Sequence, residues 1–347
     1  MMNLRRNSSI LPLLFVFLLG ASGCSAKETL QKSYGEAMGT SLMLAYYAPQ
    51  PRPEILEKAL TLLNKLEAEM TIWDRPVPSE IMKLNSTSGK SSFLLPPDST
   101  FVLRTALKYA KLSGGALDPT VGPFVKLWGV ATDHPKVPAQ ADLERDFPLV
   151  DWNLVEDRAD GFYLPKEGMI LDLGAIAKGY AADKLKELFL AEGLKSGIID
   201  LGGNIFLVGS KQDGSPWKVG VQDPLQPRGA FLGIIPVKDK SLVTSGIYER
   251  FFEENGKKYH HILNAKTGYP EENDLAGVTI VHNPSIEADA LSTAVFVLGL
   301  KKGWDLVLSQ PGVEAVFVTR DRKVYITPGL VNVFELTGKY ELVPGRP

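Results

Sequence analysis

The sequence predicts an α+β fold, and three observations lead to this class. Amphipathic helical patterns occupy residues 53–70 and 101–112, short strand patterns fill most of the second half, and the two kinds of segment do not alternate with βαβ regularity. The 347 residues are 44% hydrophobic and 22% charged, which is ordinary for a globular chain with a large core. A formal net charge of −2 without a long basic run argues against a nucleic-acid partner.

The N-terminal segment is predicted to be a lipoprotein signal peptide. Two arginines precede an apolar run of about ten residues, which is too short to span a membrane and is typical of a secretory signal. The run ends in "ASGC" at Cys24, the only cysteine, and resembles the bacterial lipobox. We expect residues 1–23 to be removed, Cys24 to be lipidated, a spacer over 24–32, and a domain over 33–347 on the periplasmic side of the inner membrane. An ordinary signal with a chance cysteine is the alternative.

The first half of the domain is expected to contain two strands and three helices. "SYGEAMGTSLMLAYY" alternates like a strand, and residues 53–70 carry one apolar stripe. Residues 101–112 form a second helix that stops at a glycine pair. "MILDLGAIAKGYAADKLKELF" combines a continuous apolar run with a helical pattern, so we expect a buried strand that leads directly into a helix.

The second half is expected to be rich in strands. "GIIDLGGNIFLVG" predicts a strand, a glycine turn and a second strand, and "WKVGVQDP", "FLGIIPV", "SLVTSG" and "AGVTIVH" predict further short strands. "KYHHILNAKTGYP" predicts a strand and a turn, and "EAVFVTRDRKVYIT" predicts a hairpin about an Asp-Arg turn. Between them, residues 283–300 form an apolar helix that should be buried.

The start of that apolar helix is the first candidate site. Asp289, Ser292 and Thr293 stand at i, i+3 and i+4, so they share one side of the helix. Their ligand atoms are all oxygens, which suits a hard ion such as Mg²⁺ and not zinc. The alternative is structural: Asp289 favours the helix N-terminus by its charge, and the hydroxyls bond back to carbonyls.

Two glycine-rich loops are further candidates. "DLGAIAKG" and "DLGGNIFLVG" each place an aspartate and glycines at the end of a strand, where free N–H groups can meet a phosphate and a carboxylate can hold a sugar hydroxyl or a cation. A plain structural turn is the alternative for each. The sequence argues against zinc-dependent hydrolysis and serine-triad catalysis, because the chain has no HExxH, CxxC or GxSxG motif.

Taken together, the motifs resemble the bacterial flavin transferase family ApbE, the FAD:protein FMN transferases. The resemblance runs from about Ser33 to the C-terminus and follows family order. It is carried by "MGT" (38–40), "SEIMKLN" (79–85), "SGGALDPTVGPFVKLWG" (113–129), "LDLGAIAKGYAADK", "DLGGNI", "TSG" (244–246), "HILNAKTGYP" and "EADALSTAVFVLG". It implies a single ApbE-like domain of mixed sheets and helices.

The resemblance also implies an activity. Members of this family transfer FMN from FAD to a threonine (or serine) of a partner protein with Mg²⁺ and release AMP. Their acceptors are typically flavin-carrying subunits of membrane redox complexes. Two alternatives remain on the same scaffold: an Mg²⁺-dependent FAD pyrophosphatase giving FMN and AMP, and a non-catalytic periplasmic flavin-binding lipoprotein.

The site residues implied by the resemblance fall into three groups. Mg²⁺ would be held by the carbonyl of Ala175 with Asp289, Ser292 and Thr293, and His261 would be the base for the acceptor hydroxyl, with Asp289 also counted as catalytic. FAD would be bound by Met38, Trp73, Ala116, Leu117, Asp118, Asp172, Lys178 and Leu263. Two departures from the family pattern are Trp73, where many relatives have tyrosine, and Asn264, which removes a charge beside His261. The adjacent His260 is expected to be structural.

Overall fold

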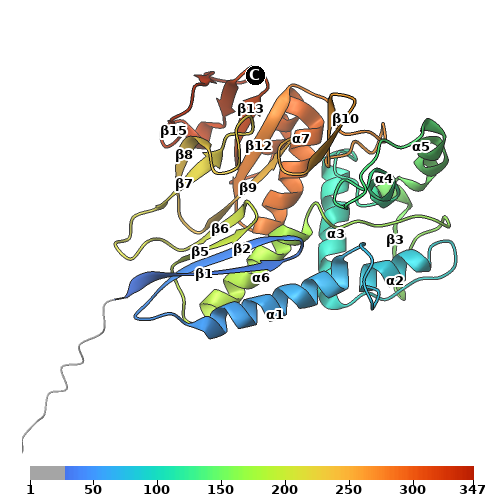
Figure 1. Cartoon of the computed structure of the whole chain (residues 1–347), viewed down its shortest axis with the longest axis horizontal. Helices are drawn as coiled ribbons and strands as arrows, with labels where there is room; N and C mark the ends of the chain where they lie inside the picture. Colours follow the sequence, from blue (N-terminus) through green and yellow to red (C-terminus); the bar gives the residue numbers. More distant parts are fainter. Residues whose placement is uncertain (1–27) are drawn as a thin grey trace, which may run out of the picture.

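The computed structural model describes residues 28–347, and a nine-stranded sheet forms its centre (Figure 1). The order is β1-β2-β5-β6-β9-β12-β13-β14-β16, and every pair is antiparallel except β14 with β16. This predominantly antiparallel sheet confirms the α+β class. The strands are β1 (Thr29–Ala37), β2 (Thr40–Ala48), β5 (Gly197–Leu201), β6 (Asn204–Val208), β9 (Lys240–Gly246), β12 (Leu275–His282), β13 (Glu314–Thr319), β14 (Lys323–Ile326) and β16 (Glu341–Leu342).

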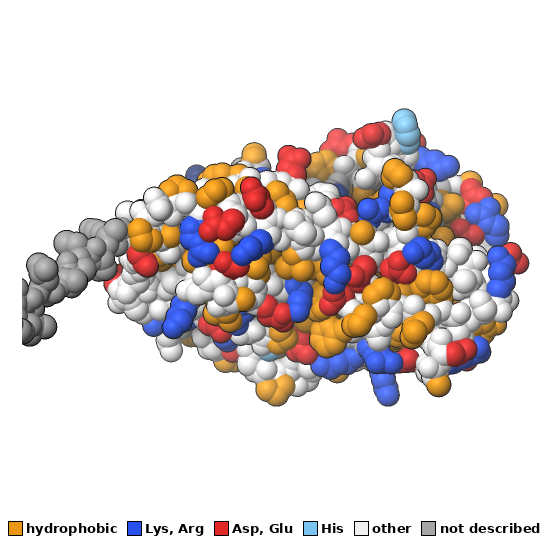
Figure 2. All heavy atoms as spheres, turned by 90° about the horizontal axis from the view of Figure 1, so that it is seen from below, with side chains coloured by type: hydrophobic (Ala, Val, Ile, Leu, Met, Phe, Trp, Pro, Cys, Tyr) orange, Lys and Arg blue, Asp and Glu red, His pale blue; other side chains and the backbone are white. Residues whose placement is uncertain are grey.

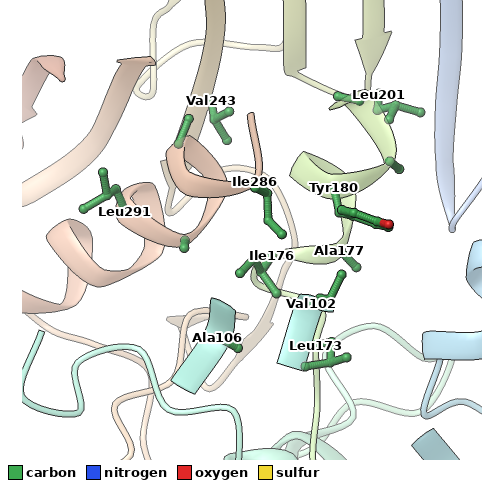
Figure 3. Close-up of a cluster of buried hydrophobic side chains, with 14 of the residues drawn as sticks. Val102, Ala106, Leu173, Ile176, Ala177, Tyr180, Leu201, Val243, Ile286 and Leu291 are labelled. Atoms are coloured by element: carbon green, nitrogen blue, oxygen red, sulfur yellow. The ribbon is translucent and has the colours of Figure 1, made fainter. Parts of the chain in front are cut away.

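Four helices form a layer on one face of this sheet. They are α1 (Pro53–Met70), α3 (Pro97–Leu112), α6 (Ala177–Ala191) and α7 (Ser285–Leu308). Helix α7 packs on β9 and β12, α6 packs on β5 and β6, and the two helices contact each other. Figure 3 shows where they meet: Val102 and Ala106 of α3, Tyr180 of α6 and Leu291 of α7 enclose one apolar cluster.

A second, three-stranded sheet covers part of the opposite face. Its order is β15 (Glu335–Leu336), β8 (Phe231–Val237) and β7 (Trp217–Gln222). Side chains alternate accordingly in β13, where Ala315 and Phe317 join the helix-side core and Val316 and Val318 join the core under the small sheet. Because both faces are covered, every residue of β12 is buried, including the polar residues Thr279 and His282.

A smaller lobe with its own core stands beside these layers. Trp128 is fully buried there against Phe252, Tyr259 and Tyr269, and its Nε1 donates to the carbonyl of Gly268 at 2.7 Å. The lobe contains α4 (Gly122–Trp128), α5 (Gln140–Asp146), β10 (Phe251–Glu254) and β11 (Lys257–His260). The remaining elements are α2 (Glu80–Ser86), β3 (Glu156–Arg158), β4 (Gly161–Tyr163), η1 (Phe147–Leu149), η2 (Trp152–Leu154) and η3 (Pro328–Leu330).

The surface agrees with the small net charge. Figure 2, which views the molecule from the side of α1, shows acidic and basic side chains interspersed over this face without a large patch of one sign. Within residues 28–347, no helix combines the length and apolar character that crossing a bilayer requires. The predicted signal peptide and Cys24 lie outside the described residues.

Two predicted elements differ from the structure. The single strand expected from Ser33 is the hairpin β1–β2, whose turn at Met38 and Gly39 has φ of 53° and 65°, and β1 begins at Thr29 inside the predicted spacer. The strand expected before α6 is absent, and only Ile170 makes an isolated bridge. Here the side chain of Asn85, and not a neighbouring strand, bonds both the N–H and the carbonyl of Leu171, at 2.8 and 3.0 Å.

The apolar helix is longer than predicted. Helix α7 begins at Ser285 and continues to Leu308, with one break at Gly299, where φ is 73°. Only a residue without a side chain adopts this conformation readily, so the glycine lets the helix change direction and continue. The other predicted segments, including α1, the β5–β6 turn and the β13–β14 hairpin, are confirmed.

Candidate active site

A cavity of about 520 Å³ lies where the N-terminal ends of α6 and α7 meet the turns of the two hairpins β1–β2 and β5–β6. This volume is in the range of small-molecule and cofactor sites. Two of the predicted site residues within the described part of the chain, Met38 and Ser292, do not line it. The others all do: Trp73, Ala116, Leu117, Asp118, Asp172, Ala175, Lys178, His261, Leu263, Asp289 and Thr293.

Asp289 is held at the cavity by two contacts between α6 and α7. The carboxylate of Asp183 in α6 accepts the N–H groups of Ser285 and Ile286 at 2.8 Å each, which fixes the first turn of α7. One turn later, Oδ2 of Asp289 accepts the N–H of Gly179 at 2.7 Å. A Cβ at Gly179 would lie 2.7 Å from the Cβ of Asp289, so only glycine permits this approach of the two helices.

The carboxyl group of Asp289 is buried, with 4% of the residue exposed, and burial raises its pKa. Lys178 and the N–H of Gly179 act in the opposite direction. The amide nitrogen of Asn204 makes no hydrogen bond of standard geometry within residues 28–347, yet it lies near enough to Asp289 to favour the charged carboxylate. A buried acid beside an unsatisfied buried donor indicates a site that a ligand completes.

The oxygen atoms around Asp289 fit Mg²⁺. Asp289, Thr293 and Ala175 all line the cavity, and they offer a carboxylate, a hydroxyl and a backbone carbonyl. Residues 28–347 hold no group of three or more His, Cys, Asp or Glu side chains suited to a metal, so a zinc-type cluster is absent from this part of the chain. The hydroxyl of Ser292 instead donates to the carbonyl of Asp289 at 2.8 Å and lies 2.9 Å from Oγ of Ser245 in β9.

The start of α6 lines the cavity next to this oxygen cluster and has the charge that suits an anion. In its first turn the N–H of Ala177 bonds the carbonyl of Leu173 and the N–H of Gly179 bonds Asp289, so a phosphate would meet the N–H of Lys178 and the positive dipole end of the helix. Lys178 lines the cavity and makes no ion pair in the described part of the chain. Asp172 uses Oδ1 to accept the N–H of Gly174 at 2.7 Å, and burial raises its pKa against the opposing charges of Lys126 and Lys178.

The two aspartates of the predicted FAD site, Asp118 and Asp172, differ in their hydrogen bonds. Asp118 Oδ1 accepts both the N–H and the hydroxyl of Thr120, at 2.8 and 2.6 Å, and its Oδ2 accepts the N–H of Trp152 at 3.2 Å. These bonds make Asp118 part of the loop structure. Asp172 bonds through one oxygen, so it is the better placed to accept from a ligand. Trp73 forms another wall, with the amine of Lys126 4.8 Å from its ring centroid.

The two neighbouring histidines differ as expected. His260 is buried, its Nε2 donates to the carbonyl of Glu271 at 3.0 Å, and burial lowers its pKa to about 4, so it is structural. His261 faces the cavity and is one-third exposed (33%). Asn264 stabilises the following turn, because its Oδ1 accepts the N–H of Lys266 at 2.8 Å and its Nδ2 donates to Glu271 at 2.5 Å.

Comparison with known proteins agrees with this arrangement. The model of the ApbE family matches residues 38–317, which is most of the chain. The chain belongs to the ApbE family.

Relatives of this ApbE-family chain share its full domain. A protein of Treponema pallidum named FAD:protein FMN transferase is 36% identical over 340 residues, covering 92% of this chain and 93% of the relative. A Klebsiella pneumoniae protein of the same name is 29% identical and covers 88% and 95%. Among solved structures, the ApbE protein of Thermotoga maritima (TM-score 0.80, 29% identical) and the flavin transferase ApbE of Vibrio cholerae (TM-score 0.79, 25% identical) each cover 88% of this chain and 99% of their own.

Four cavity residues with charged or amide side chains were not predicted as site residues of this ApbE-family protein: Asn204, Arg228, Glu249 and Arg250. Both arginines bridge loops at the cavity, since Arg228 donates to the carbonyl of Gly202 at 2.7 Å and Arg250 donates to that of Gly39 at 2.9 Å. They lie in irregular connections whose local sequence carries no periodic signal. Asn204 and Glu249 could have been identified from the sequence. Asn204 belongs to the motif "DLGGNI", and Glu249 closely follows the motif "TSG".

Proposed function

We propose that this protein transfers FMN from FAD to the hydroxyl of a threonine, or serine, in a partner flavoprotein, in an Mg²⁺-dependent reaction that releases AMP. The observation that carries the proposal is the convergence on one cavity of Asp289 and Thr293 with Lys178 and His261. Oxygen atoms suited to a hard cation, a helix start suited to a phosphate and an imidazole suited to act as a base therefore line the same cavity. The names of the relatives support the same assignment.

The residues have separable roles in this reaction. Lys178 and the start of α6 would hold the pyrophosphate, and Asp172 would accept from the sugar or adenine donors. Asp289, Thr293 and the carbonyl of Ala175 would hold Mg²⁺, which when bound offsets the charge of the pyrophosphate oxygens. His261 would accept the proton of the acceptor hydroxyl as that oxygen attacks the phosphorus of the FMN half.

FAD is expected to bind at least roughly tenfold more tightly than FMN when Mg²⁺ is present, a difference of about 1.4 kcal/mol. The physical reason is that only FAD brings an adenylate half to Asp172 and a pyrophosphate to the start of α6. Calorimetry with each nucleotide, with and without EDTA, measures the difference. Equal affinities would show that the adenylate half is not recognised and would contradict the proposed donor.

The transfer itself is tested by mixing the protein with FAD, Mg²⁺ and a candidate acceptor domain. Intact mass and in-gel fluorescence after denaturation should show an acceptor that has gained FMN covalently, with AMP released in equal amount. FMN and AMP without a modified acceptor would identify a pyrophosphatase. FAD that stays intact for hours with Mg²⁺ would identify a binding protein.

We further propose that the acceptor is a flavin-carrying subunit of a membrane redox complex and that the enzyme is lipid-anchored at the periplasmic side of the inner membrane. The support is the lipobox-like "ASGC" at Cys24. Mass spectrometry of the protein extracted from membranes should show diacylglycerol on Cys24, and Cys24→Ala should release the protein into the soluble fraction. An N-terminus beyond Cys24, or a wild-type protein that is already soluble, would contradict the anchor.

A further inference from the structure

Glu249 is an acid at the cavity to which the proposed reaction assigns no role. It lies between β9 and β10, lines the cavity, and keeps 19% of its side chain exposed. Its Oε2 is 3.9 Å from Nε2 of His261, and its carboxyl group makes no side-chain hydrogen bond within residues 28–347. The carboxyl group therefore faces the base at a separation longer than a hydrogen bond, as catalytic pairs often do before substrate binds, and the pair must close for a proton to pass.

The orientation of His261 determines which of its nitrogens faces Glu249. The carbonyl of Arg250 accepts the backbone N–H of His261 at 3.1 Å and lies 3.3 Å from its Nδ1. A carbonyl can only accept, so Nδ1 carries the proton in the neutral ring and Nε2 keeps its lone pair. That lone pair is on the side of the ring that faces the cavity and Glu249.

The charges around the pair favour a proton on the acid. Burial raises the pKa of Glu249, and the nearby Asp289 of α7 adds to this; Lys178 of α6, Arg228 and Arg250 oppose it. The net direction is still upward, so Glu249 holds its proton to a higher pH than an ordinary glutamate.

The same surroundings disfavour a proton on His261. Burial lowers its pKa to about 3, and the positive charges of Lys178 and Arg250, with His260 beside it, act in the same direction. When the pair takes up a single proton, that proton rests on the carboxyl group and not on the imidazole.

We propose that Glu249 is the final holder of the proton in the transfer reaction and acts through His261. Oγ of the acceptor threonine forms its bond to the phosphorus of the FMN half, and the bond from that phosphorus to the AMP phosphate oxygen breaks, leaving its electron pair on AMP. The threonine proton passes to Nε2 of His261 and from there to Oε2 of Glu249, which ends neutral and returns the proton to solvent. This assignment rests on the proposed function and adds a second proton-holding group to it.

The experiment compares Glu249→Gln with the matched control Glu253→Gln, which removes an exposed acid from the neighbouring strand β10. Glu249→Gln should slow transfer by roughly tenfold to a hundredfold. It should leave FAD affinity unchanged or increased, because a negative charge beside Lys178, Arg228 and Arg250 is gone. The rise in rate with pH that marks deprotonation of Glu249 should vanish, and Glu249→Asp should restore part of the rate.

A second readout needs no transfer. In FAD-free protein, the ring signals of His261 followed by NMR should show an inflection as Glu249 titrates, which Glu249→Gln abolishes and Glu253→Gln retains. An unchanged transfer rate, or a fall in FAD affinity as large as the fall in rate, would overturn the assignment, as would the absence of that inflection in wild type. Wild-type protein that shows the inflection and transfers no FMN would instead contradict the proposed function and leave the proton pair standing.

Discussion

Replacing Asp289 by asparagine is expected to lower FMN transfer by roughly a thousandfold at limiting Mg²⁺, which corresponds to about 4 kcal/mol of lost stabilisation of phosphoryl transfer. Asparagine keeps the shape and can still accept the N–H of Gly179, so the contact between α6 and α7 survives. What it removes is the single acidic side chain among the predicted Mg²⁺ ligands. High Mg²⁺ concentrations should recover part of the rate.

The same substitution should leave the metal-free fold as stable as before, or more stable. The pKa of Asp289 is higher in the folded protein than in the unfolded chain. The free energy of unfolding therefore falls as the pH rises from the pKa of the unfolded chain through the pKa of the folded protein. Above the pKa of the unfolded chain the buried carboxyl group lowers the stability of the metal-free fold, and asparagine, which does not ionise, removes this penalty. The metal-free variant should therefore melt at the same or a higher temperature at pH 7, with a weaker dependence on pH.

Two measurements decide this prediction: the melting temperature without metal, and the transfer rate against Mg²⁺ concentration. Asp223→Asn is the matched control, because Asp223 is also buried but lies outside the cavity and accepts the N–H of Leu225 at 2.9 Å. That variant should lose stability and keep its Mg²⁺ optimum. If Asp289→Asn behaved in the same way, its carboxylate would belong to the helix and not to the ion.

Replacing His261 by alanine is expected to slow transfer by roughly a hundredfold or more while FAD affinity stays nearly unchanged. The imidazole faces the cavity, and its Nε2 is the basic nitrogen because the carbonyl of Arg250 lies against Nδ1. Single-turnover transfer and calorimetry on the same preparation separate the two effects. Transfer within a few fold of wild type at every pH would show that another group is the base.

The control for this change is His260→Ala. His260 is buried, forms its hydrogen bond to Glu271 and packs edge-on against Phe296, so its loss should lower the melting temperature more than the transfer rate. In wild-type FAD-free protein, NMR titration should also find His261 neutral well below pH 6.5, since burial lowers its pKa. An ordinary histidine titration would contradict the electrostatic surroundings described here.

Much of the fold was predictable because its signals are local. The apolar stripe of residues 53–70 became α1, and the glycine pair at Gly202 and Gly203 became the β5–β6 turn with both φ positive. Asp289 and Thr293 share one side of a helix by spacing alone, and the structure places both at the cavity. Periodicity and turn chemistry act within a few residues, so one chain suffices to reveal them.

The strand predicted before α6 was wrong because a distant segment supplies the hydrogen-bonding partner there. The run before α6 has the composition of a buried strand, but Asn85 satisfies the backbone of Leu171 from another part of the chain. The role of Ser292 as a ligand stays a prediction from its spacing, and the structure adds that its hydroxyl contacts Ser245 of β9 between helix and sheet. Composition indicates that such groups are buried, but it does not indicate which hydrogen-bonding partner each group has.

The sequence by itself determined the elements, the family and most of the residues that meet at the cavity, since these follow from local pattern and from motifs in order. Only the tertiary structure decided which of those residues face one another. It placed the amide of Gly179 against Asp289, and Glu249 beside His261, by bringing α6, α7 and the loop after β9 to the same point. Distances of this kind depend on how the helices pack on the sheet, and packing is set by the whole core at once.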